Sequence, residues 1–480
     1  MVTSVLTDTS KNTGEDMNAD EFKQINPKYF VPQYTHFDRK MKLDDAFSYV
    51  TNSENIKKHK FFPFISYTKK IVKFSKDKGQ YTKERVLCYA AHMDSLIYKY
   101  YGMLLNDKLS EFLDKNSLNY CAIAYRSNLK GESNINFSKR AFDFIKKQEK
   151  AYVFIGDFKD FFPSLDHMYL KKRLCNLLGV EQLSEDYYAV FKNVTRFSMI
   201  ELEELLAINN LPNNLAGKHK FNKLKTALPD NETLNSLKKK KCIHVNRNLE
   251  NGIPQGSPIS GVLANIYMME FDLAMKHLIE EENNGLYMRY SDDIIIVLPN
   301  IEEGVFKKIY DSIINEINAI PNLILEDKKK NIFYYEHQKV LNINNGYLEK
   351  TDKNSNIINY LGFSFDGVNV TIRQKTQAKY YCRAYGKIKT IKRNSFMTKN
   401  NNKVSKKELY RNYSERHGNA GNSNGNYIDY VKRAESVYEG EKKIANIRKR
   451  HMSKIALRLK KKQSKQRQES RIYAKMYHIN

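Results

Sequence analysis

Residues 286–298 read LYMRYSDDIIIVL, two short apolar runs on either side of a polar turn. This pattern predicts a β-hairpin that carries two adjacent carboxylates, Asp292 and Asp293, at its tip. Asp also favours turns, so the tetrapeptide alone would fit an ordinary solvated turn. The segments upstream decide between these two interpretations.

A second predicted strand, Ala151–Gly156, is rich in β-branched and aromatic residues and delivers a third acid, Asp157, at its end. Two-metal catalysis of phosphoryl transfer requires carboxylates that hold two Mg²⁺ ions about 3.5–4 Å apart. Carboxylate oxygens are ligands that Mg²⁺ prefers. Three acids at strand ends therefore favour a magnesium site over a solvated turn.

Between these acids lies a Gly/Pro-rich turn, residues 251–258, read as NGIPQGSP. We expect it to open a helix with Ser257 as the N-cap and Pro258 at the first helical position. Apolar residues then recur at helical spacing, at Ile259, Val262, Leu263, Ile266, Met269 and Leu273.

In chain order, the strand ending at Asp157, the Pro254-Gln255-Gly256 turn, the hairpin and Leu361-Gly362 resemble the palm of reverse transcriptases. The resemblance covers roughly residues 85–375. It implies an α+β right-hand polymerase with fingers, palm and α-helical thumb, and an RNA-directed DNA polymerase activity. The residues of these sequence motifs are most similar to those of bacterial retroelement enzymes, and among them to those of the phage-defence (abortive-infection-like, DRT) reverse transcriptases. One departure is Ser291, where the family more often has alanine or methionine.

Carried over to this chain, the resemblance implies that Asp157 and Asp292 bridge two Mg²⁺ ions, for which Mn²⁺ could substitute. Asp293 would support the site, and the Phe158 carbonyl would be a further ligand. Phe162 would be the aromatic gate under the sugar, where a ring excludes a ribose 2′-hydroxyl and selects deoxynucleotides. The alternative is that Phe162, like most aromatic residues, belongs to the core.

Four further residues are implied in nucleotide binding. Gln255 would contact the incoming nucleotide, and Arg126 and Lys130 would reach its triphosphate, although either cation could instead be a solvated surface group. Within the lysine run 328–330, Lys329 is the best match to the general acid near the pyrophosphate, but spacing does not separate the three lysines. Leu361 and Gly362 would form the primer grip.

The net charge of +27 is concentrated near the C-terminus. Residues 373–480 contain 30 Lys/Arg against 7 Asp/Glu, a net charge of +23 that leaves +4 for the first 372 residues. Apolar residues in this part recur at helical spacing, at Tyr381, Ala384, Tyr385, Ile388 and Ile391 and again at Ile444, Ile447, Ile455 and Leu459. Such helices suit a thumb that holds a duplex by its phosphates, and a basic helix on an anionic membrane is the alternative.

These patterns divide the chain into three parts. We expect an N-terminal extension over residues 1–84, fingers and palm over 85–375 with an insertion at 183–247, and a basic helical thumb over 376–480. The first 20 residues are polar with four acids and unlike a signal peptide, and no run is long and apolar enough to span a membrane, so we expect a cytoplasmic protein. Five scattered cysteines argue against zinc and disulfides.

The expected partners are an RNA template, specifically a structured noncoding RNA, together with deoxynucleotides and the cDNA product, without a membrane. The sequence leaves self-association open. Within the class, a retron-type or maturase-like enzyme is the alternative, and an RNA-dependent RNA polymerase is disfavoured by Phe162. A catalytically idle RNA-binding scaffold is disfavoured because the three acids and Gln255 are retained. Few carboxylates follow residue 375, so a second nuclease site is not expected.

Overall fold

The structure is a computed structural model that describes residues 34–41, 43–75, 79–126, 128–129, 131–228, 230–239, 242–245, 250–347, 355–393, 406–415 and 426–460. Its centre is an antiparallel sheet of five strands in the order β6-β7-β3-β8-β9, which we call the palm sheet. The strands are β3 (Lys150–Asp157), β6 (Leu286–Tyr290), β7 (Asp293–Pro299), β8 (Asn331–Glu336) and β9 (Lys339–Asn342).

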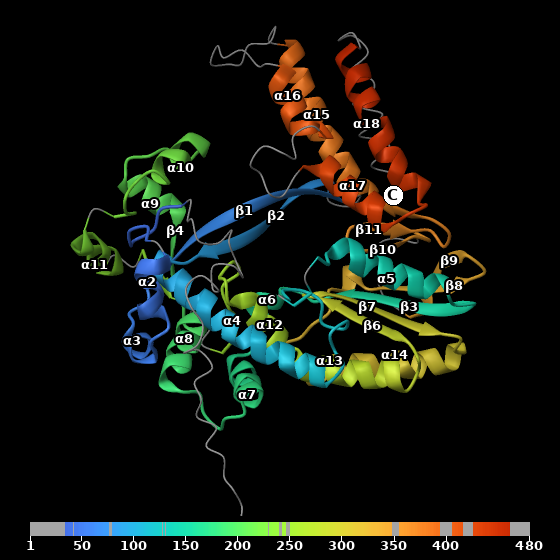
Figure 1. The fold of residues 1–480 in the computed structure, drawn as a ribbon, viewed down its shortest axis with the longest axis horizontal. Coiled ribbons are helices and arrows are strands. Elements are labelled where there is room, and N and C mark those ends of the chain that lie inside the picture. Colours follow the sequence, from blue (N-terminus) through green and yellow to red (C-terminus); the bar gives the residue numbers. More distant parts are fainter. Residues whose placement is uncertain are drawn as a thin grey trace, which may run out of the picture.

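Both faces of the palm sheet are buried. Side chains of a strand alternate between faces, so Ile294, Ile296 and Leu298 of β7 join one hydrophobic cluster while Ile295 and Val297 join another. The first cluster includes α13 (Met269–Lys276) and α14 (Glu303–Ala319), and the second includes α5 (Asn134–Lys146). Figure 1 shows these helices on opposite sides of the sheet. This double burial explains why the strands are apolar almost throughout.

The side of the molecule drawn mainly in blue and green in Figure 1 is built around a second sheet, of order β2-β1-β4-β5. A long hairpin joins β1 (Phe64–Ser75) to β2 (Gly79–Tyr89), and β4 (Ser198–Glu201) runs parallel to β1 and pairs with β5 (His244–Val245). The same side of the molecule also carries the helices α2 (Leu43–Val50), α3 (Ser53–Lys58), α4 (His92–Lys115), α7 (His167–Leu178) and α8 (Glu185–Thr195). The predicted boundary between residues 84 and 85 falls inside β2. The structure therefore does not separate an N-terminal extension from the following residues at this point.

The predicted insertion, residues 183–247, contributes structure to this second sheet rather than a separate appendage. It supplies α8, β4 and β5 together with α9 (Leu202–Ile208), α10 (Leu215–Phe221) and α11 (Asn231–Lys239). Beyond α8, its apolar residues form a small core of their own, which includes Ile200, Leu205, Leu206 and Phe221 and reaches Ile65 of β1. We call this cluster the insertion core.

The C-terminal part begins with a three-stranded sheet, β10 (Ile358–Tyr360), β11 (Phe363–Phe365) and β12 (Val370–Ile372). The helices that follow are α15 (Gln374–Arg393), α16 (Lys406–Tyr413), α17 (Tyr427–Val437) and α18 (Lys442–Lys460), which rise above the palm sheet in Figure 1. The residues expected at helical spacing are buried or half-buried: Tyr381, Ala384, Tyr385, Ile388, Ile391, Ile444, Ile447, Ile455 and Leu459. The predicted amphipathic helices are therefore confirmed.

The helix after the Gly/Pro-rich turn starts later than predicted. It is α12 (Ser260–Tyr267), and its N-cap residue is Ile259, which makes no side-chain cap. Ser257 instead lies in the preceding turn, where its carbonyl accepts from the Ser260 N–H at 3.2 Å. The N-cap assignment to Ser257 and the first helical position at Pro258 were wrong, because the turn continues for three residues after Gly256. The remaining short helices are α6 (Phe161–Ser164), a π-helix at His277–Glu281 and 3₁₀ turns at Asp327–Lys329 and Asn344–Gly346.

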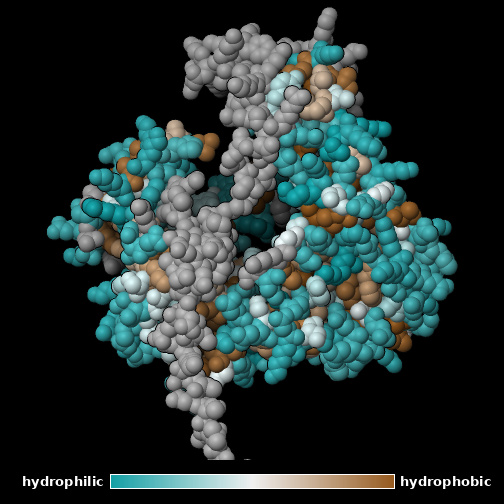
Figure 2. Space-filling model, viewed as in Figure 1, coloured by the Kyte–Doolittle hydropathy of each residue, from teal (hydrophilic) through white to brown (hydrophobic). Residues whose placement is uncertain are grey.

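The face seen in Figure 2 is mainly hydrophilic and is hollowed between the side that carries α9 and α10 and the side formed by the palm sheet and C-terminal helices. Among the helices that the structure describes, none has the length and apolar character needed to span a membrane.

Because the insertion core is small and largely separate, we expect it to open without the palm. Leu205→Ala should destabilise it by about 2–5 kcal/mol, the usual effect of truncating a buried leucine. Hydrogen exchange should then accelerate over residues 198–228, while β3 and β7 keep their protection. Ile295→Ala is the matched control and should loosen the palm strands instead. A uniform loss of protection in Leu205→Ala would show that the two cores unfold together.

Candidate active site

Three carboxylates meet at one end of the palm sheet. β3 and β7 pair so that Asp157 lies opposite Asp293, and Asp292 occupies the turn that joins β6 to β7. The carbonyl of Asp292 accepts from the Phe158 N–H at 2.9 Å, which ties the turn to the residue after β3. Ser291, the first turn residue, has φ of 60°, as the first position of such a tight turn requires. The predicted hairpin and its convergence with Asp157 are thus present.

Burial and the charges of neighbouring acids raise the pKa values of Asp292 and Asp293. Burial, followed by the charges of Asp292 and Asp157, raises the pKa of Asp293 to about 7, and the carboxyls of Asp293 and Asp157 share a hydrogen bond. Burial and the charge of Asp157 also raise the pKa of Asp292. A cation placed among the three carboxylates would relieve this repulsion.

One lysine already relieves part of the repulsion among the carboxylates. The ammonium of Lys329, from the 3₁₀ turn Asp327–Lys329, forms an ion pair with Asp157. Its neighbours behave differently, because Lys330 pairs with Asp327 at 2.7 Å and Lys328 is exposed. The geometry therefore separates the three lysines that spacing could not, and it brings Lys329 to the carboxylates.

As they stand, no three His, Cys, Asp or Glu side chains in the described part of the chain are arranged to hold a metal ion. The three-carboxylate cluster nevertheless fits divalent cations by its chemistry, since it offers oxygen ligands whose mutual repulsion keeps two of the acids at raised pKa. A cation on Asp157 would have to displace the ammonium of Lys329.

A buried ion pair that sequence reasoning missed supports the hairpin from behind. Arg289 of β6 is fully buried and donates through Nε and Nη2 to the two carboxylate oxygens of Asp272 in α13, at 2.8 and 2.6 Å. Its Nη1 donates to the Ser291 carbonyl and to Asn265 of α12, both at 3.2 Å. Burial alone would lower the pKa of Arg289, but Asp272 outweighs burial and keeps it raised.

This network reaches further. Tyr287 donates to Asp272 at 2.7 Å, and Asn265 donates to the Ala124 carbonyl at 2.7 Å. Two helices, a strand, the Ser291–Asp292 turn and the loop before α5 therefore share one polar centre. A sequence signal was present, an arginine at an inward position of an apolar strand, but its acidic partner lies 17 residues away on another element.

The aromatic residues after Asp157 have different surroundings. Phe161 is 3% exposed and belongs to the core, whereas Phe162 is only half-buried and meets Tyr125 edge-on, with ring centroids 6.4 Å apart. A Cβ on Gly261 would lie 2.8 Å from the Tyr125 ring, so this ring lies directly on the first turn of α12. The Phe162 carbonyl accepts from the Ile253 N–H at 3.0 Å, which fixes its backbone against the Gly/Pro-rich turn.

That turn rests on the end of β2. The Gln255 carbonyl accepts from the Cys88 N–H at 2.9 Å, and Gly256 has φ of 116° with its Cβ position only 2.4 Å from the Cys88 carbonyl oxygen. Only glycine fits there. The side chain of Gln255 is half-buried.

Of the two basic candidates before α5, Arg126 alone lies in the described part of the chain. The guanidinium of Arg126 donates within its own loop, to the Ala122 carbonyl at 3.1 Å and to Asn119 at 2.7 Å. Lys130 lies outside the described residues.

Leu361 and Gly362 form the tight turn between β10 and β11, both with positive φ. Asn134, at the start of α5, donates to the Leu361 carbonyl at 2.8 Å and to the Tyr430 hydroxyl at 3.1 Å. The charge of Asp293 contributes, after burial, to the raised pKa of Tyr360, which precedes this turn. The hairpin thus lies near the carboxylates and is attached to α17.

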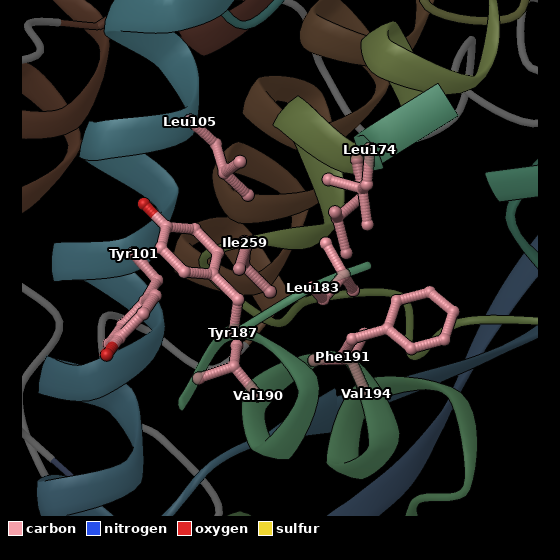
Figure 3. Close-up of a pocket in the computed structure, with 10 residues that line it drawn as sticks. Tyr101, Leu105, Leu174, Leu183, Tyr187, Val190, Phe191, Val194 and Ile259 are labelled. Atoms are coloured by element: carbon pink, nitrogen blue, oxygen red, sulfur yellow. The ribbon is translucent and has the colours of Figure 1, made fainter. Parts of the chain in front are cut away.

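An apolar pocket elsewhere is not a rival site. It lies between α4, α7, α8 and the start of α12, and Figure 3 shows its lining of leucine, valine, tyrosine and phenylalanine side chains, Leu174 and Leu183 among them. Its cavity volume of ≈ 10 Å³ suits about one water molecule. We regard it as a packing defect of the core.

Residues 210–365 match the family model described as reverse transcriptase (RNA-dependent DNA polymerase). The chain carries a reverse transcriptase domain. The matched range contains Gln255, Asp292, Asp293 and Lys329, whereas Asp157 precedes it and is brought to the reverse transcriptase hairpin by the pairing of β3 with β7. The sheet-centred palm between helical parts is the predicted right-hand polymerase fold.

Two solved structures illustrate what the chain is similar to. Telomerase from Candida tropicalis, truncated from its C-terminal domain, shares 14% identity over 64% of this chain and 55% of that chain, with a TM-score of 0.37. Telomerase from Candida albicans, in complex with a TWJ fragment of telomeric RNA, shares 13% identity over 83% of this chain and 64% of that chain, with a TM-score of 0.38. The chain spans less than two thirds of these telomerase chains. None of the curated proteins matches it.

The pKa of Asp293 makes the stability of the metal-free protein depend on pH. This carboxyl has a pKa of about 7 when folded and about 3.9 when unfolded, so the folded state binds more protons between these values and loses stability as pH rises through that window. The slope reaches at most about 1.4 kcal/mol per pH unit. Melting temperatures in EDTA from pH 5 to 8 should fall, and Asp293→Asn should flatten the fall. Identical profiles for both proteins would contradict the raised pKa.

The Arg289–Asp272 pair can be tested through its asymmetry. Arg289→Met leaves the Asp272 carboxylate buried without its partner and should cost about 3–5 kcal/mol of unfolding free energy. Adding Asp272→Leu should recover much of that loss, since the uncompensated charge is gone. The turn should not recover, because the Ser291 carbonyl still lacks its donor. Denaturant titration and hydrogen exchange at Asp292 and Asp293 measure the two effects separately. Full restoration of both by the double substitution would contradict a specific role for Arg289.

Proposed function

We propose that this protein is an RNA-directed DNA polymerase that synthesises cDNA by two-metal nucleotidyl transfer. One observation carries the proposal: Asp157, Asp292 and Asp293 converge at the end of the palm sheet beside the reverse transcriptase hairpin. Such a cluster suits phosphoryl transfer, in which positioning and charge stabilisation do most of the work.

In this proposal Asp157, Asp292 and Asp293, together with the Phe158 carbonyl, would hold two divalent cations, Mg²⁺ or Mn²⁺. When bound, these ions supply charge stabilisation for the attacking hydroxyl and the departing pyrophosphate. Lys329 leaves Asp157 and turns to the pyrophosphate as the general acid. Its present ion pair with Asp157 supports this role, because it places a proton donor at the carboxylates.

The remaining roles concern substrate recognition. Phe162 acts as the gate under the sugar, supported by its half-buried ring beside Tyr125. Gln255 contacts the nucleotide from a turn seated on β2. Arg126 and Lys130 bind the triphosphate once the Arg126 guanidinium leaves Asn119. Leu361 and Gly362 grip the primer strand, and the basic α15–α18 region holds the duplex by its phosphates.

Asp157→Asn, or Asp292→Asn, should reduce primer extension to background while RNA binding changes only a few-fold, because a metal ligand is lost but the basic surface is intact. Asp160→Asn is the matched control. Asp160 is exposed, lies three residues further on, and has φ of 45°, a conformation that asparagine tolerates well. Primer extension with purified protein is the measurement. Activity of either site variant at the level of Asp160→Asn would refute the assignment.

Phe162→Ala should open space for a ribose 2′-hydroxyl and raise ribonucleotide incorporation relative to deoxynucleotide by roughly 10- to 100-fold, the range that shape exclusion of a hydroxyl supplies. Phe161→Leu alters a neighbouring ring that is buried in the core and should leave the ratio unchanged. Competition between the two nucleotides on one template measures the ratio. An unchanged ratio in a folded Phe162→Ala variant would show that Phe162 is a core residue and not a sugar gate.

We further propose that the template is a dedicated structured noncoding RNA and that the cDNA acts in antiphage defence in the cytoplasm. The similarity of the sequence blocks to phage-defence enzymes and the large C-terminal charge support this idea. Sequencing the RNA that copurifies with the protein, together with cDNA from cells, tests it. One dominant RNA encoded near the gene, with matching cDNA, is expected. If the copurifying RNA is instead a random sample of cellular RNA, the dedicated-template proposal fails and the protein is a general reverse transcriptase.

A further inference from the structure

The first 372 residues have a nearly balanced charge, yet one segment of the insertion departs from that balance. From residue 205 to residue 229 there is no acidic residue, while four lysines and one histidine fall within eight positions. They are Lys218, His219, Lys220, Lys223 and Lys225, and we call them the α10 basic patch. All are exposed except Lys218, which is half-buried.

These cations have no acidic partner among the described residues. The ion pairs of the described residues involve none of the five, whereas lysines of α3, α4, α5 and α13 each form at least one. No acidic side chain in the described part of the chain therefore neutralises their charge. The patch lies at the end of the lobe that faces the C-terminal helices across the hollow seen in Figure 2.

The patch is held on a fixed support. Phe221 is 1% exposed and anchors α10 in the insertion core. A Cβ on Gly217 would lie 1.8 Å from the Pro212 carbonyl oxygen, so the helix packs directly on the preceding turn. The segment after α10 is fastened to the N-terminal side of the described chain, where Thr35 donates to the Leu224 carbonyl at 2.9 Å and Ala227 donates to the His36 carbonyl at 2.7 Å.

A rigid, unneutralised group of lysines suits a polyanion, since little ordering entropy is lost on binding. Lipid insertion does not fit, because Phe221 of this short helix is buried in the insertion core and Leu215 is the one large apolar side chain that the helix exposes. The chain carries a reverse transcriptase domain, so the polyanion it meets is nucleic acid.

We propose that the α10 basic patch binds the phosphates of the RNA template outside the palm, as a second contact surface separate from the α15–α18 region. The proposal rests on the proposed function. It gives the insertion a role, that of holding template RNA which has not yet entered the palm. Lysines that contact phosphates displace condensed counterions, so the affinity attributable to the patch depends on salt.

The test uses the full chain with two substitutions, Lys220→Gln with Lys223→Gln. Two probes are compared: an overhang probe, which is a DNA primer annealed to an RNA with a long single-stranded 5′ overhang, and a short-template probe, which is the same duplex with only a few unpaired template nucleotides. For the overhang probe, the slope of log affinity against log salt should become shallower by about 1.4, the loss of two phosphate contacts. Binding and extension of the short-template probe should be unchanged.

Two control variants isolate charge and position. Lys220→Arg with Lys223→Arg keeps the charge and should retain the wild-type slope. Lys307→Gln with Lys308→Gln removes the same charge from exposed positions on α14, on the far side of the palm sheet, and should also leave the slope unchanged. If the α14 variant weakens overhang binding as much as the α10 variant, the effect is one of net charge and the proposal fails.

Ultraviolet crosslinking of the overhang, followed by peptide mapping, adds a readout independent of affinity. Crosslinks at residues 215–225 are expected, and their absence with unchanged overhang affinity would overturn the proposal. Failure of the proposed function would give a different result: the wild-type protein would not extend the short-template probe, whether or not it binds the long overhang. Preferential binding of an acidic protein segment over the RNA overhang would also refute the assignment.

Discussion

The buried pair of Arg289 and Asp272 is the interaction on which the rest of the palm depends. A fully buried guanidinium is tolerated only when its donors are satisfied, and here they are met by one carboxylate, one amide and one backbone carbonyl. Those acceptors come from α13, α12 and the Ser291–Asp292 turn. Because the buried charge is costly unless these hydrogen bonds form, it holds the three elements in one arrangement. The turn that carries Asp292 is thereby fixed through the Ser291 carbonyl. The carboxylates themselves repel one another, so they could not supply this order.

Much of the palm could be predicted because it depends on local patterns. Two short apolar runs on either side of the polar turn identified the hairpin, and a strand ending at Asp157 identified its partner. The order of these blocks then indicated the fold. The helical stripes of the C-terminal part were found for the same reason, since each stripe is a property of one helix.

What could not be predicted depends on residues far apart in the chain. The assignment of Lys329 needed the 3₁₀ turn that points one lysine of three at Asp157. Asp272, Asn265 and Asn134 carry no motif, and their importance follows only from where their partners lie. The late start of α12 has a similar origin, because the turn before it is shaped by its contact with Cys88 rather than by a capping side chain.

The strand order of the palm sheet also has a consequence for how the protein is made. β3 is the central strand, yet both of its neighbours, β7 and β8, come much later in the chain. At ribosomal rates of 5–20 residues per second, the 179 residues from Asp157 to Glu336 take about 10 to 35 s to synthesise. Until β7 is complete at Pro299, 142 residues after Asp157, β3 has no strand on either edge, and β8 follows later. The fingers helices and the insertion core can fold meanwhile from local contacts, and the palm closes only when its last strands emerge.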